Sequence, residues 1–224
     1  MSASQEADQA AGPRFIAVEG PIGVGKTSLA QRLADSFASE LILERPEENP
    51  FLERFYRNPR YAALPTQLFF LLQRARQVEE LRQSDMFSPV RIADFLIDKD
   101  RLFAEMNLDA SELKLYDQVA ENLSIDPPRP DLVIYLQAPA QVLMRRIASR
   151  GVAYEQFIEP PYLERLGEAY AKFFYEYDRA PLLIVNAAAI DPIHREADYQ
   201  ELLRMIMRIK HGRHFFNPTA GAIA

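Results

Sequence analysis

Residues 20–27 read Gly20-Pro21-Ile22-Gly23-Val24-Gly25-Lys26-Thr27, and this stretch decides the fold. It satisfies the P-loop pattern G-x-x-x-x-G-K-[ST] and lies between an apolar run at 15–18 and an amphipathic stretch. The glycines let the backbone N–H groups surround a phosphate, and a helix that starts near Lys26 directs the positive end of its dipole at the same charge. The alternative is a glycine-rich turn with a chance lysine. We therefore predict a nucleotide-phosphate site formed by Gly20, Gly23, Val24, Gly25, Lys26, Thr27 and Ser28.

Short apolar runs alternate with longer amphipathic stretches along the rest of the chain. The runs at 15–18, 41–43, 90–93, 132–136 and 182–185 predict five strands. Their nearly continuous hydrophobicity is typical of a parallel sheet covered on both faces, and the segments between them are long enough for helical crossovers. We predict a doubly wound α/β fold with a five-stranded parallel sheet. Helices are expected at 25–38, 65–82, 110–123, 139–150, 161–177 and 199–210.

The chain has 224 residues, which suits one α/β domain better than two. Residues 1–13 are polar and lack periodicity, so we expect a disordered leader, a single domain over 14–211 and a loosely ordered tail over 212–224.

Composition excludes several kinds of protein. The formal net charge of -6 and the lack of a long Lys/Arg block argue against binding of a nucleic acid polymer. The sequence contains no cysteine, which excludes disulfides and thiolate metal sites. No stretch approaches the ~20 apolar residues of a membrane span, and the first residues do not resemble a signal peptide. We expect a cytoplasmic protein without a membrane partner.

Two carboxylates lie directly after predicted strands. Asp94 comes after the run at 90–93, and Glu44 comes after the run at 41–43. Carboxyl ends of parallel strands meet at one edge of the sheet, where α/β proteins bind ligands. A P-loop needs a carboxylate near its metal, so we assign Mg²⁺ to Thr27 and Asp94. Two acids at one edge suit two roles, one at Mg²⁺ and one that receives a proton from an attacking hydroxyl. The alternatives are a turn or helix-cap role for Asp94 and a solvated acid for Glu44, since Glu47 and Glu48 lie close by in the sequence.

Further segments carry a family resemblance. After Glu44 come NPFLERFY at 49–56 and LPTQLFFL at 64–71, and together they resemble the deoxynucleoside kinase family, especially its bacterial deoxyadenosine and deoxyguanosine kinases. The resemblance covers nearly the whole ordered chain. It implies a P-loop nucleoside kinase fold with a helical lid, and a Glu44 that deprotonates the 5′-hydroxyl of the substrate. It also implies that Tyr56 contacts the sugar 3′-hydroxyl and that Gln67, eleven residues later, reads the base edge.

The resemblance extends to the base pocket and the lid. Arg74 lies seven residues after Gln67, on the same helical face, and an acid at Asp100 or Asp98 would orient it. Phe51, Phe69 and Phe70 are candidates for the base slot, with ordinary core packing as the alternative. Arg146 and Arg150 share a helical face before residues 151–156, and they match arginines that neutralise the transferring phosphate. Glu155 matches the acid that joins the tyrosine at the 3′-hydroxyl. A solvated basic face is the alternative for the arginines.

The chain departs from the family pattern at two places. Most members carry an arginine directly after the Asp94-equivalent acid, whereas this chain continues with Phe95-Leu96. Lys99 and Arg101 are the candidates to replace that cation. Val152 also stands where many relatives carry a third lid arginine.

These features predict transfer of the ATP γ-phosphate, with Mg²⁺, to the 5′-hydroxyl of a deoxynucleoside, with a purine preferred, in nucleotide salvage. A nucleoside monophosphate kinase, such as a thymidylate kinase, would need a basic pocket for the acceptor phosphate, whereas the Glu44 loop is acidic. A non-catalytic nucleotide-gated switch would not need Gln67, Tyr56 and Glu155 at these spacings. The family resemblance also implies a homodimer built on the helices at 65–82 and 110–123, although a monomer core needs apolar stripes too.

Overall fold

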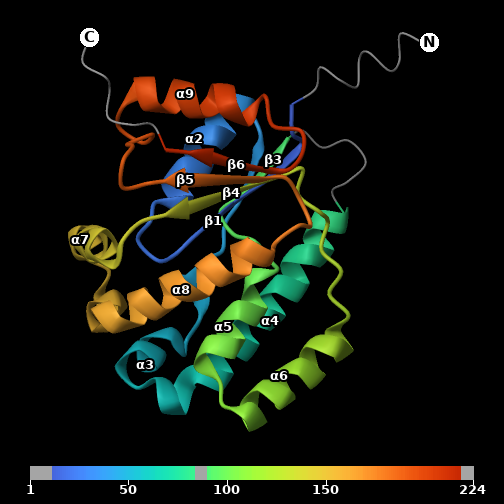
Figure 1. Cartoon of the computed structure of the whole chain (residues 1–224). Coiled ribbons are helices and arrows are strands. Elements are labelled where there is room, and N and C mark those ends of the chain that lie inside the picture. Colours follow the sequence, from blue (N-terminus) through green and yellow to red (C-terminus); the bar gives the residue numbers. More distant parts are fainter. Residues whose placement is uncertain (1–11, 84–89, 218–224) are drawn as a thin grey trace.

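The fold is a single parallel sheet with helices on both faces, seen in a computed structural model that describes residues 12–83 and 90–217. The strand order is β2-β3-β1-β4-β5-β6, and every neighbouring pair is parallel (Figure 1). Most of the leader predicted at 1–13 lies outside the described residues. The strands are β1 Phe15–Glu19, β2 Glu40–Ile42, β3 Arg91–Ala93, β4 Leu132–Gln137, β5 Leu182–Asn186 and β6 Arg213–Phe216.

Helices cover the two faces of this sheet in the doubly wound manner. In Figure 1, α2 and α9 lie on one face, α4, α5 and α8 lie on the other, and α6 packs outside α4. The helices thereby cover the apolar side chains on both faces of the sheet, as continuously buried strands require. The helices are α2 Lys26–Phe37, α3 Leu52–Arg57, α4 Pro59–Gln83, α5 Lys99–Asn107, α6 Ala110–Leu123, α7 Ala140–Arg150, α8 Pro160–Glu176 and α9 Glu196–Ile206, with short 3₁₀ turns η1 Pro46–Glu48 and η2 Ala153–Phe157.

The parallel arrangement places the ends of β1, β2 and β3 at one edge. β1 pairs with β3 and β4, and β2 pairs with β3, so the residues directly after these strands emerge side by side. On the face covered by α8, Phe174 stacks on Tyr135 of β4 with ring centroids 4.2 Å apart. This packing fixes α8 and its Tyr170 close to the end of β1.

The predicted number of strands was wrong, because the sheet has six strands where we expected five. The sixth, β6, falls inside 212–224, which we expected to be loosely ordered. It pairs with β5, and its Phe216 is buried, whereas Phe215 is exposed. A four-residue edge strand with one covered side lacks the continuous apolar run that marks the central strands. Residues after 217 lie outside the described part of the chain.

Three helices also differ from the expectation, and the first of them, α3, was not predicted. α4 begins at Pro59 and carries Pro65 inside it, so the helix extends six residues before the predicted start at 65. α5 was not predicted, because it begins with Lys99, Asp100 and Arg101, a charged run without an apolar stripe. None of the helices in residues 12–83 and 90–217 is long and apolar enough to cross a membrane.

Candidate active site

The P-loop connects the end of β1 to the start of α2. Gly25 has φ 105°, and a Cβ added there would meet nothing within 4 Å, so the backbone faces open space. Gly20 lies against β4, where a Cβ would come within 2.3 Å of the Leu136 carbonyl oxygen. Both positions therefore require glycine, one for its backbone conformation and one for its close approach. Lys26 Nζ donates to the carbonyl oxygens of Gly20 at 2.7 Å and Pro21 at 3.3 Å.

A cavity of about 320 Å³ opens in front of this loop. Its volume falls within the range of small-molecule sites. The structure brings most of the predicted site residues to its wall: Gly20, Gly23, Lys26, Thr27, Glu44, Tyr56, Gln67, Asp94, Asp100, Arg150 and Glu155. The other predicted residues, Val24, Gly25, Ser28, Arg74 and Arg146, are not among its lining residues.

Asp94 joins the P-loop to the loop that carries Glu44. Thr27 Oγ1 donates to Asp94 Oδ2 at 2.6 Å, and the backbone N–H of Glu44 donates to Asp94 Oδ1 at 2.7 Å. Asp94 is buried. A hydroxyl and a carboxylate oxygen side by side fit Mg²⁺, which takes few protein ligands and completes its shell with phosphate oxygens and water. Thr27 and Asp94 are therefore the residues that would hold this ion.

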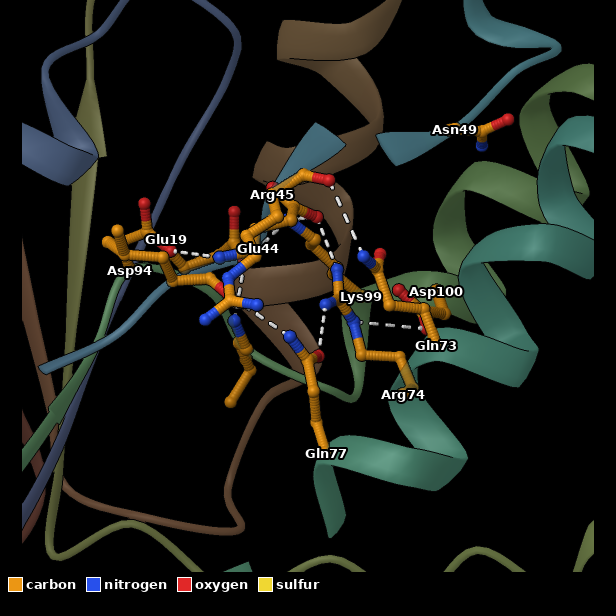
Figure 2. Close-up of polar contacts among 12 residues, drawn as sticks. Glu19, Glu44, Arg45, Asn49, Gln73, Arg74, Gln77, Asp94, Lys99 and Asp100 are labelled. Atoms are coloured by element: carbon orange, nitrogen blue, oxygen red, sulfur yellow. Dashed lines mark hydrogen bonds and ion pairs between the residues drawn. The ribbon is translucent and has the colours of Figure 1, made fainter. Parts of the chain in front are cut away.

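Glu44 lies between two buried cations. Figure 2 shows it among Arg74 from α4 and Lys99 from α5, with Glu19 and Asp94 on the sheet side. Lys99 Nζ is 2.8 Å from Glu44 Oε1, and Arg74 Nη2 donates to the same oxygen. Burial acts to raise the pKa of Glu44, but Lys99 first and Arg74 second outweigh it and lower that pKa to about 2. Glu44 is thus a carboxylate at neutral pH.

The two candidate replacements for the family arginine occupy different surroundings. Lys99 is buried, lines the cavity and contacts Glu44. Arg101 is exposed on the far side of α5, where it pairs with Glu105 at 3.0 Å and Asp117 at 2.6 Å. Of these two candidates, Lys99 therefore lies beside Glu44, and Arg101 does not.

Of the two candidate acids, Asp100 on α5 faces Arg74, and Asp98 does not. Asp100 Oδ2 is 3.4 Å from Arg74 Nε, whereas Asp98 pairs with Arg179. Burial raises the pKa of Asp100 to about 6, although Arg74 and Lys99 act to lower it. Arg74 is completely buried, and its Nη1 donates to Gln77 Oε1 at 2.7 Å. The guanidinium therefore lies behind the cavity wall, among Glu44, Gln77 and Asp100.

The same cavity contains the residues predicted for the sugar, Tyr56 and Glu155. Arg150 Nε donates to Glu155 Oε2 at 3.1 Å, which links the end of the lid helix α7 to η2. Tyr56 stacks on Tyr154 with ring planes 8° apart, and burial raises the pKa of Tyr56 well above its usual value. Tyr56 is thus held as a neutral hydroxyl that can donate a hydrogen bond.

Arg146, the other predicted lid arginine, is a bridge between backbone segments. Its Nη1 donates to the carbonyl of Val24 at 2.9 Å, and its Nη2 donates to the carbonyl of Ala187 at 2.7 Å. It therefore connects the P-loop to the loop after β5. Its contact with a transferring phosphate stays a prediction.

Sequence reasoning missed part of the cavity. Of the three phenylalanines considered for the base slot, Phe70 lines the cavity and Phe51 and Phe69 do not, while Phe103 lines it unexpectedly. Glu19 was also missed, although it ends β1 much as Asp94 comes directly after β3. The rule that carboxylates at strand ends gather at one edge would have found it.

This fold, with a P-loop beside strand-end carboxylates, defines a P-loop kinase of the nucleoside type. The chain belongs to the deoxynucleoside kinase family, because residues 16–210 match the family model described as "Deoxynucleoside kinase". It is 36% identical to a deoxyguanosine kinase of Bacillus subtilis over 84% of this chain and 93% of the relative. It is 29% identical to a deoxyadenosine kinase of Lactobacillus acidophilus over 86% of this chain and 94% of the relative. The solved structure of a deoxyadenosine kinase of M. mycoides has the same fold, with a TM-score of 0.75 at 24% identity over 86% of this chain and 98% of that one.

Proposed function

We propose that this protein transfers the γ-phosphate of ATP to the 5′-hydroxyl of a purine deoxynucleoside, with Mg²⁺, giving the 5′-monophosphate and ADP. The observation that carries the proposal is one cavity that holds Lys26 and Glu44 together with Gln67, Tyr56 and Glu155. Relatives named deoxyguanosine kinase and deoxyadenosine kinase support the choice of acceptor. A cytoplasmic role in nucleotide salvage is part of the same proposal.

The transfer itself needs positioning and charge stabilisation more than covalent chemistry. The 5′-oxygen attacks the γ-phosphorus while the bond from phosphorus to the ADP oxygen breaks, and Glu44 accepts the proton that the hydroxyl loses. Lys26 moves from the carbonyls of Gly20 and Pro21 to the phosphate oxygens. Mg²⁺ on Thr27 and Asp94 would neutralise phosphate charge. Lys99 supplies a cation beside Glu44, where the family resemblance implies an arginine.

Base selection rests on Gln67, Arg74 and Asp100. Gln67 is buried on the cavity wall, and its amide offers a donor and an acceptor side by side. Adenine presents the complementary pair at N7 and N6. Asp100 lines the cavity, and its buried Oδ2 forms an ion pair with Arg74 Nε at 3.4 Å but accepts no hydrogen bond. A base edge that donates to Asp100 would supply that hydrogen bond while Arg74 holds the carboxylate from behind, which favours a polar base edge over a methyl group.

The test is a panel of deoxynucleosides, ribonucleosides and their monophosphates incubated with Mg-ATP and scored for phosphate transfer. The proposal requires transfer to deoxyadenosine or deoxyguanosine. Transfer to monophosphates alone would indicate a nucleoside monophosphate kinase, and nucleotide binding without transfer would indicate a switch. A preference for thymidine over both purines would contradict the assignment of the base pocket alone.

Gln67→Ala is expected to lower kcat/KM for the best purine substrate by roughly ten- to a hundredfold, because an unpaired polar group costs about 1–3 kcal/mol. Discrimination among bases should shrink at the same time. Gln118→Ala, an exposed glutamine on α6, is the matched control. Unchanged kinetics of the Gln67 variant across the four deoxynucleosides would contradict its assignment.

The homodimer is a further part of the proposal. Leu72 on α4 and Leu115 on α6 are each 46% exposed, and the two helices pack together. Large exposed apolar side chains on adjoining helices are typical of a protein interface. We expect a dimer mass in analytical ultracentrifugation, and a shift to monomer when both leucines become glutamate. A monomer in the wild type at micromolar concentration would contradict the dimer.

A further inference from the structure

Glu19 is a fully buried carboxylate at the end of β1, directly before the P-loop. Its Oε1 accepts hydrogen bonds from the backbone N–H of Gly20 at 2.7 Å and from the hydroxyl of Tyr170 at 2.8 Å. Its Oε2 accepts from the backbone N–H of Leu96 at 2.7 Å and lies 3.3 Å from Lys99 Nζ. One side chain therefore joins the P-loop, the segment after β3, α5 and α8.

A buried charge of this kind is costly unless donors and an opposite charge surround it. Lys99 provides the opposite charge, and it faces Glu19 and Glu44 together. Burial acts to lower the pKa of Lys99, but Glu19 first and Glu44 second outweigh it and raise that pKa above its usual value. Lys99 is therefore an ammonium shared by two carboxylates, as Figure 2 shows.

The two carboxylates together determine where the Lys99 ammonium lies relative to Glu44. The side chain of Lys99 is 5% exposed, so water contributes little to its solvation. Without the charge of Glu19, the ammonium has one carboxylate left and would pair with Glu44 alone. The position of the ammonium against the proton-accepting carboxylate would then be fixed from one side only. With Glu19 present, Lys99 Nζ lies 2.8 Å from Glu44 Oε1 and 3.3 Å from Glu19 Oε2, so both carboxylates hold its position.

We propose that Glu19 is a positioning residue for phosphate transfer, acting through Lys99 on Glu44. This inference rests on the proposed function, because it concerns the proton-accepting carboxylate of that reaction. Glu19 does not line the cavity and so does not contact the substrate. Its contribution should consequently appear in kcat and not in binding of the deoxynucleoside.

The experiment is a double-mutant cycle between Glu19→Gln and Lys99→Met, with full kinetics on the best deoxynucleoside. Glutamine keeps the size of Glu19, but its amide places a neutral donor group toward Leu96 N–H and Lys99. We expect each single variant to lose on the order of 10²-fold in kcat, with KM for the deoxynucleoside within about threefold of the wild type. The kcat of the double variant should be no lower than that of the less active single variant, because the effects of two residues that act through one path are not additive.

Two controls separate positioning from loss of structure. Arg101→Met removes a charge from the same helix at an exposed site, and its kcat should stay within about twofold of the wild type. Glu19→Asp keeps the charge one methylene further back, so it should recover part of the kcat lost in Glu19→Gln. If Glu19→Gln alone does not fold, the cycle is run with Glu19→Asp in its place, alone and combined with Lys99→Met.

Three outcomes would overturn the inference: losses in kcat that multiply in the double variant, a Glu19→Gln enzyme with wild-type kcat, or a change confined to KM. They differ from failure of the proposed function, which would appear as a wild-type enzyme that phosphorylates no deoxynucleoside in the panel.

Discussion

Replacing Lys26 with alanine is expected to lower the rate of phosphate transfer by on the order of 10³-fold or more while the protein stays folded. The ammonium of Lys26 lies at the mouth of the P-loop, where it contacts only the carbonyl oxygens of Gly20 and Pro21 among the contacts of the described residues. Burial, and then the nearby Lys99, lowers its pKa, so the position favours an incoming anion. The triphosphate supplies that anion, and alanine offers no replacement charge.

The measurement is single-turnover transfer with saturating Mg-ATP, accompanied by thermal unfolding. The side chain contributes little apolar packing, so Tm should change by only a few degrees. Lys114→Ala, an exposed lysine on α6, is the matched control and should retain wild-type transfer. Near-wild-type turnover of the Lys26 variant would remove the basis for assigning the P-loop to the phosphate donor.

The central sheet could be predicted from sequence because its strands are buried on both faces. β1, β4 and β5 are continuous apolar runs, and the P-loop glycines define the turn between β1 and α2. β6 was not predicted, because an edge strand with alternating exposure carries a weaker hydrophobic pattern. α5 escaped because it buries Lys99 and Asp100, and a helix that buries charges inverts the hydrophobic pattern on which helix prediction depends.

The members of the site were largely predictable, whereas their partners were not. Spacing placed Gln67 and Arg74 on one helical face, and strand ends placed Glu44 and Asp94 at one edge. The sequence alone does not say that the Arg74 guanidinium contacts Glu44, or that Lys99 and not Arg101 faces the cavity. Such pairings arise from how α4 and α5 pack against each other, and helical periodicity carries no information on that packing.

Glu44→Gln is expected to reduce kcat by on the order of 10²-fold or more, with little change in affinity for the deoxynucleoside. The amide has nearly the size of the carboxylate but cannot accept the proton from the 5′-hydroxyl. Its backbone N–H still donates to Asp94, so the loop should keep its place. Stability should fall as well, because Lys99 and Arg74 lose a shared counterion, although Glu19 and Asp100 remain beside them.

Kinetics across a series of variants separates proton acceptance from simple charge compensation. Glu48→Gln, an exposed glutamate in the same loop, should behave as the wild type and is the control for charge removal. Glu44→Asp restores the negative charge but shortens the side chain, so it should recover thermal stability more fully than kcat if reach to the hydroxyl matters. A loss confined to KM in Glu44→Gln would make Glu44 a binding residue. Full recovery of kcat in Glu44→Asp would reduce its role to holding Lys99 and Arg74 in place.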